Sequence, residues 1–142
     1  VCEDLWHMSL PLLQALKGAK VIIGIAVSPT RLALNSKSKI LKNYEINSEQ
    51  HRAYARLLSI YMVFCNRVGY EDGVNFWGGS EIVDPFGTVD KVAKFFDEDM
   101  ITSEINMNSI KRARQLARHF LDEDVNFLRN EVQLLHDELA KI

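Results

Sequence analysis

Apolar residues recur at helical spacing near the start of the chain and then form an unbroken run. A short helix is predicted between Ser9, which can cap its first turn, and Gly18, which can end it. The apolar residues of this helix share one face: Leu12, Leu13 and Leu16. Residues 20–27 are continuously apolar and rich in β-branched side chains, which is typical of a strand covered on both faces.

A polar stretch over residues 28–48 separates this strand from the next element, and loops of that length are usually functional or mobile. Ser48 then opens a second predicted helix. Its apolar residues fall at helical spacing: Ala53, Leu57, Leu58 and Tyr61. Residues 62–68 begin with the apolar run 62–65 and are predicted to form a second buried strand.

The second half of the chain begins with shorter elements. Four glycines within residues 69–79 predict a segment of turns. Residues 80–83 and 88–94 are predicted strands, joined by a reverse turn at residues 84–87. Residues 100–105 are a further predicted strand. With the helices on either side, this alternation predicts an α/β fold.

Two helices are predicted to end the chain. Asn106 or Asn108 caps a basic helix that runs to about Phe120, and Asp122 begins the last helix. The last helix has an apolar seam with alternating spacings of four and three: Leu121, Val125, Leu128, Val132, Leu135, Leu139 and Ile142. Two interpretations stay open, since the seam fits either docking on the chain's own sheet or a contact between subunits of a homo-oligomer.

Composition narrows the class of protein. The chain has 142 residues, which is the size of one domain, with residues 1–120 as its body and residues 121–142 as a C-terminal helix. A net charge of −2 argues against a nucleic-acid partner, and no apolar run is long enough for a membrane span. Two cysteines and no secretory signal predict a reducing, cytoplasmic location. The four histidines show no metal-type spacing, so neither a metal site nor a cofactor is predicted.

Cys2 is the first candidate for chemistry. It follows Val1, which looks like the end of a strand, and two acids, Glu3 and Asp4, come after it. Residues at that position of an α/β sheet face a crevice, where a thiol becomes a nucleophile if a base or cation lowers its pKa. The alternative is a small buried residue, which is also the expectation for Cys65.

Residues 1–6, Val-Cys-Glu-Asp-Leu-Trp, resemble the nucleophile motif of the carbon–nitrogen hydrolase (nitrilase) superfamily. Residues 66–69, 76–80 and 84–87 are similar to a second signature of that superfamily, in the same order and at the expected distance. The resemblance covers positions 1 to about 120. It implies the C-terminal half of an α-β-β-α sandwich. The Cys-Glu-Asp form is similar to the glutamine-amidase branch, whereas Phe-Cys-Asn-Arg-Val-Gly is similar to general amidases.

The resemblance also implies a mechanism and its participants. Cys2 attacks an amide or nitrile carbon to form a thioester or thioimidate, and the backbone N–H of Glu3 helps to hold the oxyanion. The general base Glu and the oxyanion-binding Lys of the superfamily lie upstream of the cysteine, so an upstream half of the domain is expected as a partner. The chain begins one residue before Cys2, and we expect it to be inactive alone. Glutaminase modules and non-catalytic interaction domains are the alternatives to an amidase or nitrilase.

Seven residues are candidates for binding the small amide or nitrile: Glu3, Trp6, Ser28, Thr30, Arg31, Phe76 and Trp77. Most of these positions have a plainer alternative, because residues 28–31 can form a turn, Glu3 can be a solvated acid and the pair Phe76 and Trp77 can pack in the core. Asn66 and Arg67 end a buried strand and either orient loops around the site or form structural bonds.

Overall fold

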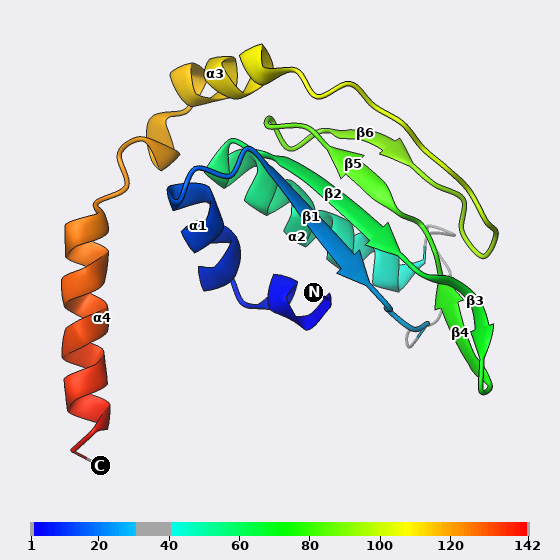
Figure 1. Cartoon of the computed structure of the whole chain (residues 1–142), viewed down its shortest axis with the longest axis horizontal. Coiled ribbons are helices and arrows are strands. Elements are labelled where there is room, and N and C mark those ends of the chain that lie inside the picture. Colours follow the sequence, from blue (N-terminus) through cyan, green and yellow to red (C-terminus); the bar gives the residue numbers. More distant parts are fainter. Residues whose placement is uncertain (1, 31–40, 142) are drawn as a thin grey trace.

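A computed structural model of the chain describes residues 2–30 and 41–141, which form a mixed sheet with helices on one face (Figure 1). The first two strands pair in parallel and the other neighbours pair antiparallel. In sheet order the strands are β1 (Val21–Ala26), β2 (Tyr61–Asn66), β5 (Glu81–Val83) and β6 (Val89–Val92). The predicted α/β class is confirmed.

The helical elements fall into an early group that packs on the sheet and a late group that follows it. The early group is η1 (Cys2–Trp6), α1 (Ser9–Leu16) and α2 (Lys42–Leu58). The late group is α3 (Met107–Leu116), η2 (Arg118–Phe120) and α4 (Val125–Leu139). The short 3₁₀ helix η1 lies against β1, and α2 crosses β2 and β5. None of the helices within residues 2–30 and 41–141 is long and apolar enough to cross a bilayer.

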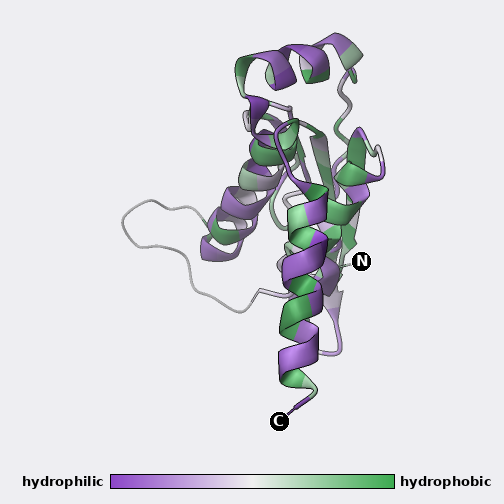
Figure 2. Ribbon diagram, turned by 90° about the vertical axis from the view of Figure 1, so that its left-hand side faces the viewer, coloured by the Kyte–Doolittle hydropathy of each residue, from purple (hydrophilic) through white to green (hydrophobic). Residues whose placement is uncertain are grey.

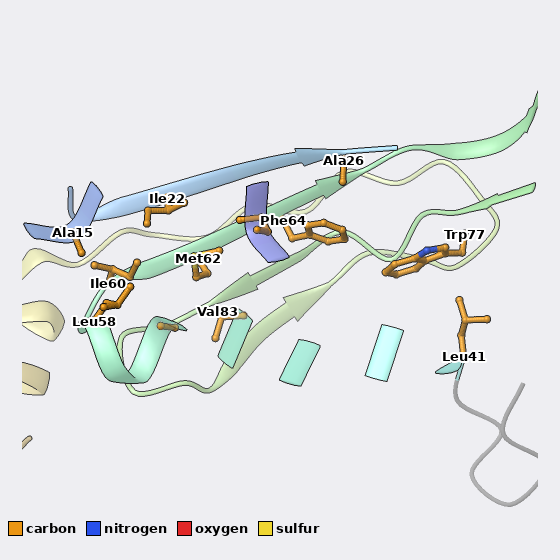
Figure 3. Close-up of a cluster of buried hydrophobic side chains, with 12 residues drawn as sticks. Ala15, Ile22, Ala26, Leu41, Leu58, Ile60, Met62, Phe64, Trp77 and Val83 are labelled. Carbon is orange, nitrogen blue, oxygen red and sulfur yellow. The ribbon is translucent and has the colours of Figure 1, made fainter. Parts of the chain in front are cut away.

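The hydrophobic core lies between the sheet and α2 (Figure 3). The strands contribute Ile22, Ala26, Met62, Phe64 and Val83, whose side chains all point toward the helix layer in Figure 3. These positions follow the two-residue period of a strand, so every second side chain of β1 reaches the core. Removal of this apolar area from water is the main force that holds α2 to the sheet.

The opposite face of the sheet is open in the described part of the chain. Ile23 and Ile25 of β1 are 64% and 60% exposed, and they lie in register with Val63 and Cys65 of β2. The described helices cover one face of residues 20–27, and the open face is the one that an upstream half of the domain is expected to cover. The expectation that Cys65 is a core residue is wrong, since its side chain points to the open face.

Helix α2 begins at Lys42, well before the predicted start at Ser48, and Tyr61 belongs to β2. The early turns were hidden in the sequence because polar residues, Asn43 and Asn47, occupy buried positions of the helix. The predicted long loop is thus shorter, and its residues 31–40 lie outside the described residues.

Residues 69–79 hold a β-hairpin where only turns were predicted. Strands β3 (Val68–Glu71) and β4 (Val74–Trp77) pair antiparallel, and Asp72 and Gly73 form the two-residue turn. Both turn residues have positive φ, 48° and 79°, as a type I′ turn requires. The Asp-Gly pair is a known hairpin signal, so the sequence contained this element.

The predicted strand at residues 100–105 is wrong. Alternate side chains of this segment are half-buried, but its bonds to the neighbouring strand β6 come from side chains. Lys91 donates to the carbonyl of Thr102 at 2.6 Å, and Ser103 bonds the carboxylate of Asp90. Such a segment shows the alternation of a strand without the backbone ladder that defines one.

The helix starts follow the predicted capping chemistry in part. The side chain of Asn106 caps α3 as predicted, accepting from a backbone N–H at 2.9 Å. Asp124 caps α4, so this helix starts later than the predicted Asp122. Ser9 is not a cap, because Met8 occupies that position without a side-chain bond. Helix α3 ends at Leu116, and the short η2 completes the region predicted as one helix to Phe120.

Helix α4 extends away from the sheet, beyond α1 (Figure 1). Hydrophilic and hydrophobic residues alternate along it in Figure 2, yet none of its residues is buried. The interpretation in which this helix docks on its own sheet is therefore wrong for the described structure.

Candidate functional site

A cavity of about 480 Å³ opens beside Cys2, near the carboxyl end of β1. Its volume lies within the range of about 300–1,000 Å³ that is usual for small-molecule sites. The residues around it come from η1, from the end of β1 and from the first turns of α2: Cys2, Glu3, Trp6, Val27, Ser28, Pro29, Asn43, Ile46 and Asn47. The cavity is lined by both polar and apolar groups, as expected for a site that orients a polar molecule.

The position of Cys2 is set by Leu5, the buried residue of η1. The side chain of Leu5 packs on Gly24 of β1, where even a Cβ atom would lie 2.6 Å from its Cδ1. The carbonyl of Leu5 accepts hydrogen bonds from Gln50 Nε2 at 2.7 Å and from Tyr54 Oη at 2.9 Å. Both donors belong to α2, so the helix that carries Cys2 is fixed to the sheet and to α2 at once.

Glu3 and Trp6 are exposed residues of η1, and both lie at the rim of the cavity. The backbone N–H of Glu3 is in the first turn of η1, where N–H groups have no acceptor within the helix. The structure thus brings together a thiol, a carboxylate and a backbone donor in one short segment.

Ser28 follows β1 and is held by two residues of the second sequence signature. Its backbone N–H donates to Asn66 Oδ1 at 2.9 Å, and its hydroxyl accepts from Trp77 Nε1 at 3.2 Å. Asn66 also donates from Nδ2 to the carbonyl of Gly78 at 2.9 Å. Asn66 is therefore a buried bridge that ties the loop after β1 to the loop after β4.

Three predicted binding residues in the described part of the chain do not line the cavity: Thr30, Phe76 and Trp77. Phe76 and Trp77 are buried in the core, where Trp77 stacks on Phe64 with ring centroids 6.0 Å apart. Thr30 bonds Asn75 of the hairpin through its side chain and its N–H, at 2.8 Å each. Arg31 lies outside the described residues. Arg67 pairs with Glu71 and lies over the ring of Phe76, which is the structural alternative considered for it.

Three residues of α2 line the cavity and were missed in the sequence. Asn43 donates to the carbonyl of Pro29 at 3.3 Å, and Asn47 donates to the carbonyl of Asn43 at 2.7 Å. Ile46 supplies the apolar part of this wall. The helical spacing of residues 43 and 47 was the available signal, but it was obscured when the helix was taken to begin at Ser48.

A buried polar network lies next to this wall, between α2 and β5. Glu81 Oε1 is 2.7 Å from His51 Nδ1, and Glu81 Oε2 accepts from Ser48 Oγ at 3.0 Å. All three residues are buried, so the carboxylate is paired on both oxygens as buried charges require. Nearby, burial raises the pKa of Tyr44 above its ordinary value of 10.0. This network fixes α2, and with it the asparagine wall, over the sheet.

The chemistry available at the cavity is that of a thiol with polar neighbours. No lysine or arginine within residues 2–30 and 41–141 contributes to the lining. In the same part of the chain, no three His, Cys, Asp or Glu side chains gather as metal ligands would. The site fits nucleophilic attack by sulfur on a small polar molecule, with amide and backbone groups to orient it.

Comparison with known proteins identifies the family. Residues 1–115 match the family described as carbon-nitrogen hydrolase. Over 118 residues the chain is 32% identical to a glutamine-dependent NAD(+) synthetase of Aquifex aeolicus, covering 82% of this chain and 19% of that protein. It is 25% identical over 122 residues to N-carbamoylputrescine amidase of Oryza sativa subsp. japonica, covering 80% of this chain and 39% of the amidase.

Solved structures show the same fold. A carbon-nitrogen hydrolase from Helicobacter pylori G27 superposes with a TM-score of 0.74 at 22% identity, covering 92% of this chain and 47% of that one. The chain therefore spans less than half the length of these relatives.

Proposed function

Since the chain belongs to the carbon–nitrogen hydrolase family, we propose that it carries the nucleophile of a thiol amidohydrolase. Cys2 attacks the carbon of a non-peptide amide, carbamoyl group or nitrile. The observation that carries the proposal is the position of Cys2 beside a cavity of small-molecule size, on a helix anchored by Leu5. A thiolate is a strong nucleophile, and the anchored helix supplies the fixed position that attack requires.

The proposed reaction of an amide has two stages. The Cys2 thiolate bonds to the carbonyl carbon, and the electrons move to the oxygen, which accepts a hydrogen bond from the N–H of Glu3. The carbon–nitrogen bond then breaks, a general acid passes its proton to the leaving amine, and a thioester remains on Cys2. Water, deprotonated by the same group, attacks the thioester, releasing the acid and restoring the thiol. A nitrile passes through a thioimidate instead.

The general base and the oxyanion-binding cation are proposed to come from an upstream half of the domain. The described lining holds no lysine, and its one carboxylate, Glu3, lies on the rim. An oxyanion donor is worth about 10²–10³ in rate, and acid–base help about 10²–10⁴. Without both, we expect turnover by residues 1–142 alone to be close to background.

The substrate is proposed to lie between η1 and the asparagine wall. Glu3, Trp6 and Ser28 were the predicted contacts, and Asn43 and Asn47 add amide groups opposite them. A glutaminase module that supplies ammonia to a synthetase is the second candidate. It is favoured by the carboxylate of Glu3 at the cavity rim, which is suited to bind the α-amino group of glutamine.

The test compares Cys2→Ser with Cys65→Ser, the other cysteine of the chain. The chain is mixed with its separately expressed upstream segment and given acetamide, a carbamoyl amine, a nitrile or glutamine. We expect turnover and a trapped acyl adduct with Cys65→Ser, and neither with Cys2→Ser. Because Cys65 is exposed, iodoacetamide labels both thiols, and the informative result is that substrate slows labelling of Cys2 alone.

Turnover by Cys2→Ser would refute the assignment of the nucleophile. A preference for glutamine over the simple amides, lost on Glu3→Gln but kept by Asp4→Asn, would select the glutaminase. A similar rate on all amides would favour the general amidase.

A further inference from the structure

Helix α4 carries an apolar stripe with the spacing of a coiled coil. In the heptad notation abcdefg, the a positions are Val125, Val132 and Leu139, and the d positions are Leu128 and Leu135. None of the residues of α4 is buried by the rest of the chain. The stripe is continuous over the whole helix, so its exposure is not the scattered kind that ordinary surfaces show.

The length of α4 makes a partner necessary. It has 15 residues, and isolated helices of about 12–15 residues are only marginally stable in water. Asp124 caps its first turn with two bonds of 2.9 Å, which helps the start of the helix but covers none of its apolar side chains. Most helical stability in proteins comes from packing of the apolar face, and the described residues of this chain cover that face only in part, at the half-buried Leu128.

We propose that α4 pairs with α4 of a second copy of this chain, as a parallel, in-register, two-stranded coiled coil. The identity of the core residues supports two strands. Valine at the first two a positions with leucine at the d positions is the combination that favours parallel dimers. Leucine at a with isoleucine at d, the combination that favours larger assemblies, occurs only at the C-terminal end of the seam, at Leu139 and Ile142.

The flanking charges support the parallel direction. The g positions are acidic, Asp124 and Glu131, and the e positions are Arg129 and His136. In a parallel pair each g residue faces the following e residue of the other helix, so Asp124 meets Arg129 and Glu131 meets His136. In an antiparallel pair acids would face acids, and Arg129 would face a second e residue. The charges are complementary in one direction only.

The mass of the full chain in solution tests the pairing. We expect twice the 16.3 kDa chain mass by light scattering. Val132→Asp places an unpaired charge in the seam and should weaken the dimer about 100-fold or more, giving the single mass. Leu134→Asp is the matched control, because Leu134 is as exposed as Val132, 57% each, but occupies a c position off the seam. This control should stay dimeric.

A crosslink tests the direction. In a chain with Cys2→Ser and Cys65→Ser, Val125→Cys should form a disulfide-linked dimer on mild oxidation, because equal a positions face each other only in a parallel pair. His136→Glu should weaken the dimer and Glu131→Lys should restore it in the double variant. A monomeric wild-type chain would overturn the proposal, as would equal masses of Val132→Asp and Leu134→Asp or no Val125→Cys crosslink.

Discussion

Gly24 is the point at which the sheet meets the helix that carries Cys2. A Cβ atom at this position would lie 2.6 Å from Cδ1 of Leu5, closer than side-chain atoms pack. We expect Gly24→Ala to displace the Leu5 side chain, to lower the free energy of unfolding and to shift η1. The change is one methyl group, yet it acts on the residue that fixes the nucleophile.

The expected change in the free energy of unfolding can be worked out for each single variant and for the double variant. Overpacking by one methyl group in a tight core costs about 1–3 kcal/mol. Replacing glycine by alanine inside a strand returns about 0.5–1 kcal/mol, so the net loss for Gly24→Ala is about 1 kcal/mol. Leu5→Ala alone leaves a cavity and costs about 2–5 kcal/mol. In the double variant the new methyl group takes part of the vacated space, so the total should fall below the sum by about 1 kcal/mol or more.

Urea unfolding of the wild type, the two single variants and the double variant measures these terms. Ile23→Ala is the control on the same strand, because Ile23 faces the open side of the sheet and its loss should change stability by less than about 0.5 kcal/mol. In a Cys65→Ser background, the rate of iodoacetamide labelling of Cys2 should change with Gly24→Ala and not with Ile23→Ala. Additive costs in the double variant, or an unchanged labelling rate, would refute the packing argument.

Two further predictions concern the network under the asparagine wall. Glu81→Ala leaves His51 without its buried partner and should lower the free energy of unfolding, measured in urea, by about 3–5 kcal/mol. The control Glu49→Ala, on the exposed face of α2, should have little effect. A loss below about 1 kcal/mol for Glu81→Ala would contradict the importance of the network. Because burial raises the pKa of Tyr44, the unfolded chain loses this proton first, so stability should decrease as the pH rises above 10.0. Tyr44→Phe should reduce that decrease and the exposed Tyr70→Phe should not, as pH-dependent unfolding would measure.

The sequence predicted the elements whose buried positions are occupied by apolar residues. The strand at Val21–Ala26 was found because it is a continuous apolar run, and the strand at Glu81–Val83 because glycines and a Pro-containing reverse turn bound a short β-branched segment. The start of α2 was missed because Asn43 and Asn47 are polar residues at buried positions, which the hydrophobic period does not register. Their burial depends on bonds to backbone carbonyls, which only the folded chain reveals.

The candidate site was predicted in the same uneven way. Cys2, Glu3 and Trp6, which the motif at residues 1–6 indicated, lie together at one cavity. Trp77 belongs to the second motif but packs in the core and does not line the cavity. Its indole N–H donates to the hydroxyl of Ser28, which does line the cavity. A sequence motif therefore does not distinguish residues that line the cavity from residues that support the lining residues from the core.

The placement of the two tryptophans also makes the chain its own fluorescence probe. Trp77 is fully buried, whereas Trp6 is 50% exposed at the cavity rim. Indole emission shifts to longer wavelength in water, so Trp77 should dominate the short-wavelength signal and report unfolding. The long-wavelength signal of Trp6 should respond to a molecule that enters beside Cys2. In a Trp77→Phe variant, Trp6 would be the one remaining tryptophan, so its emission would report binding at the cavity while all the cavity-lining residues stay unchanged.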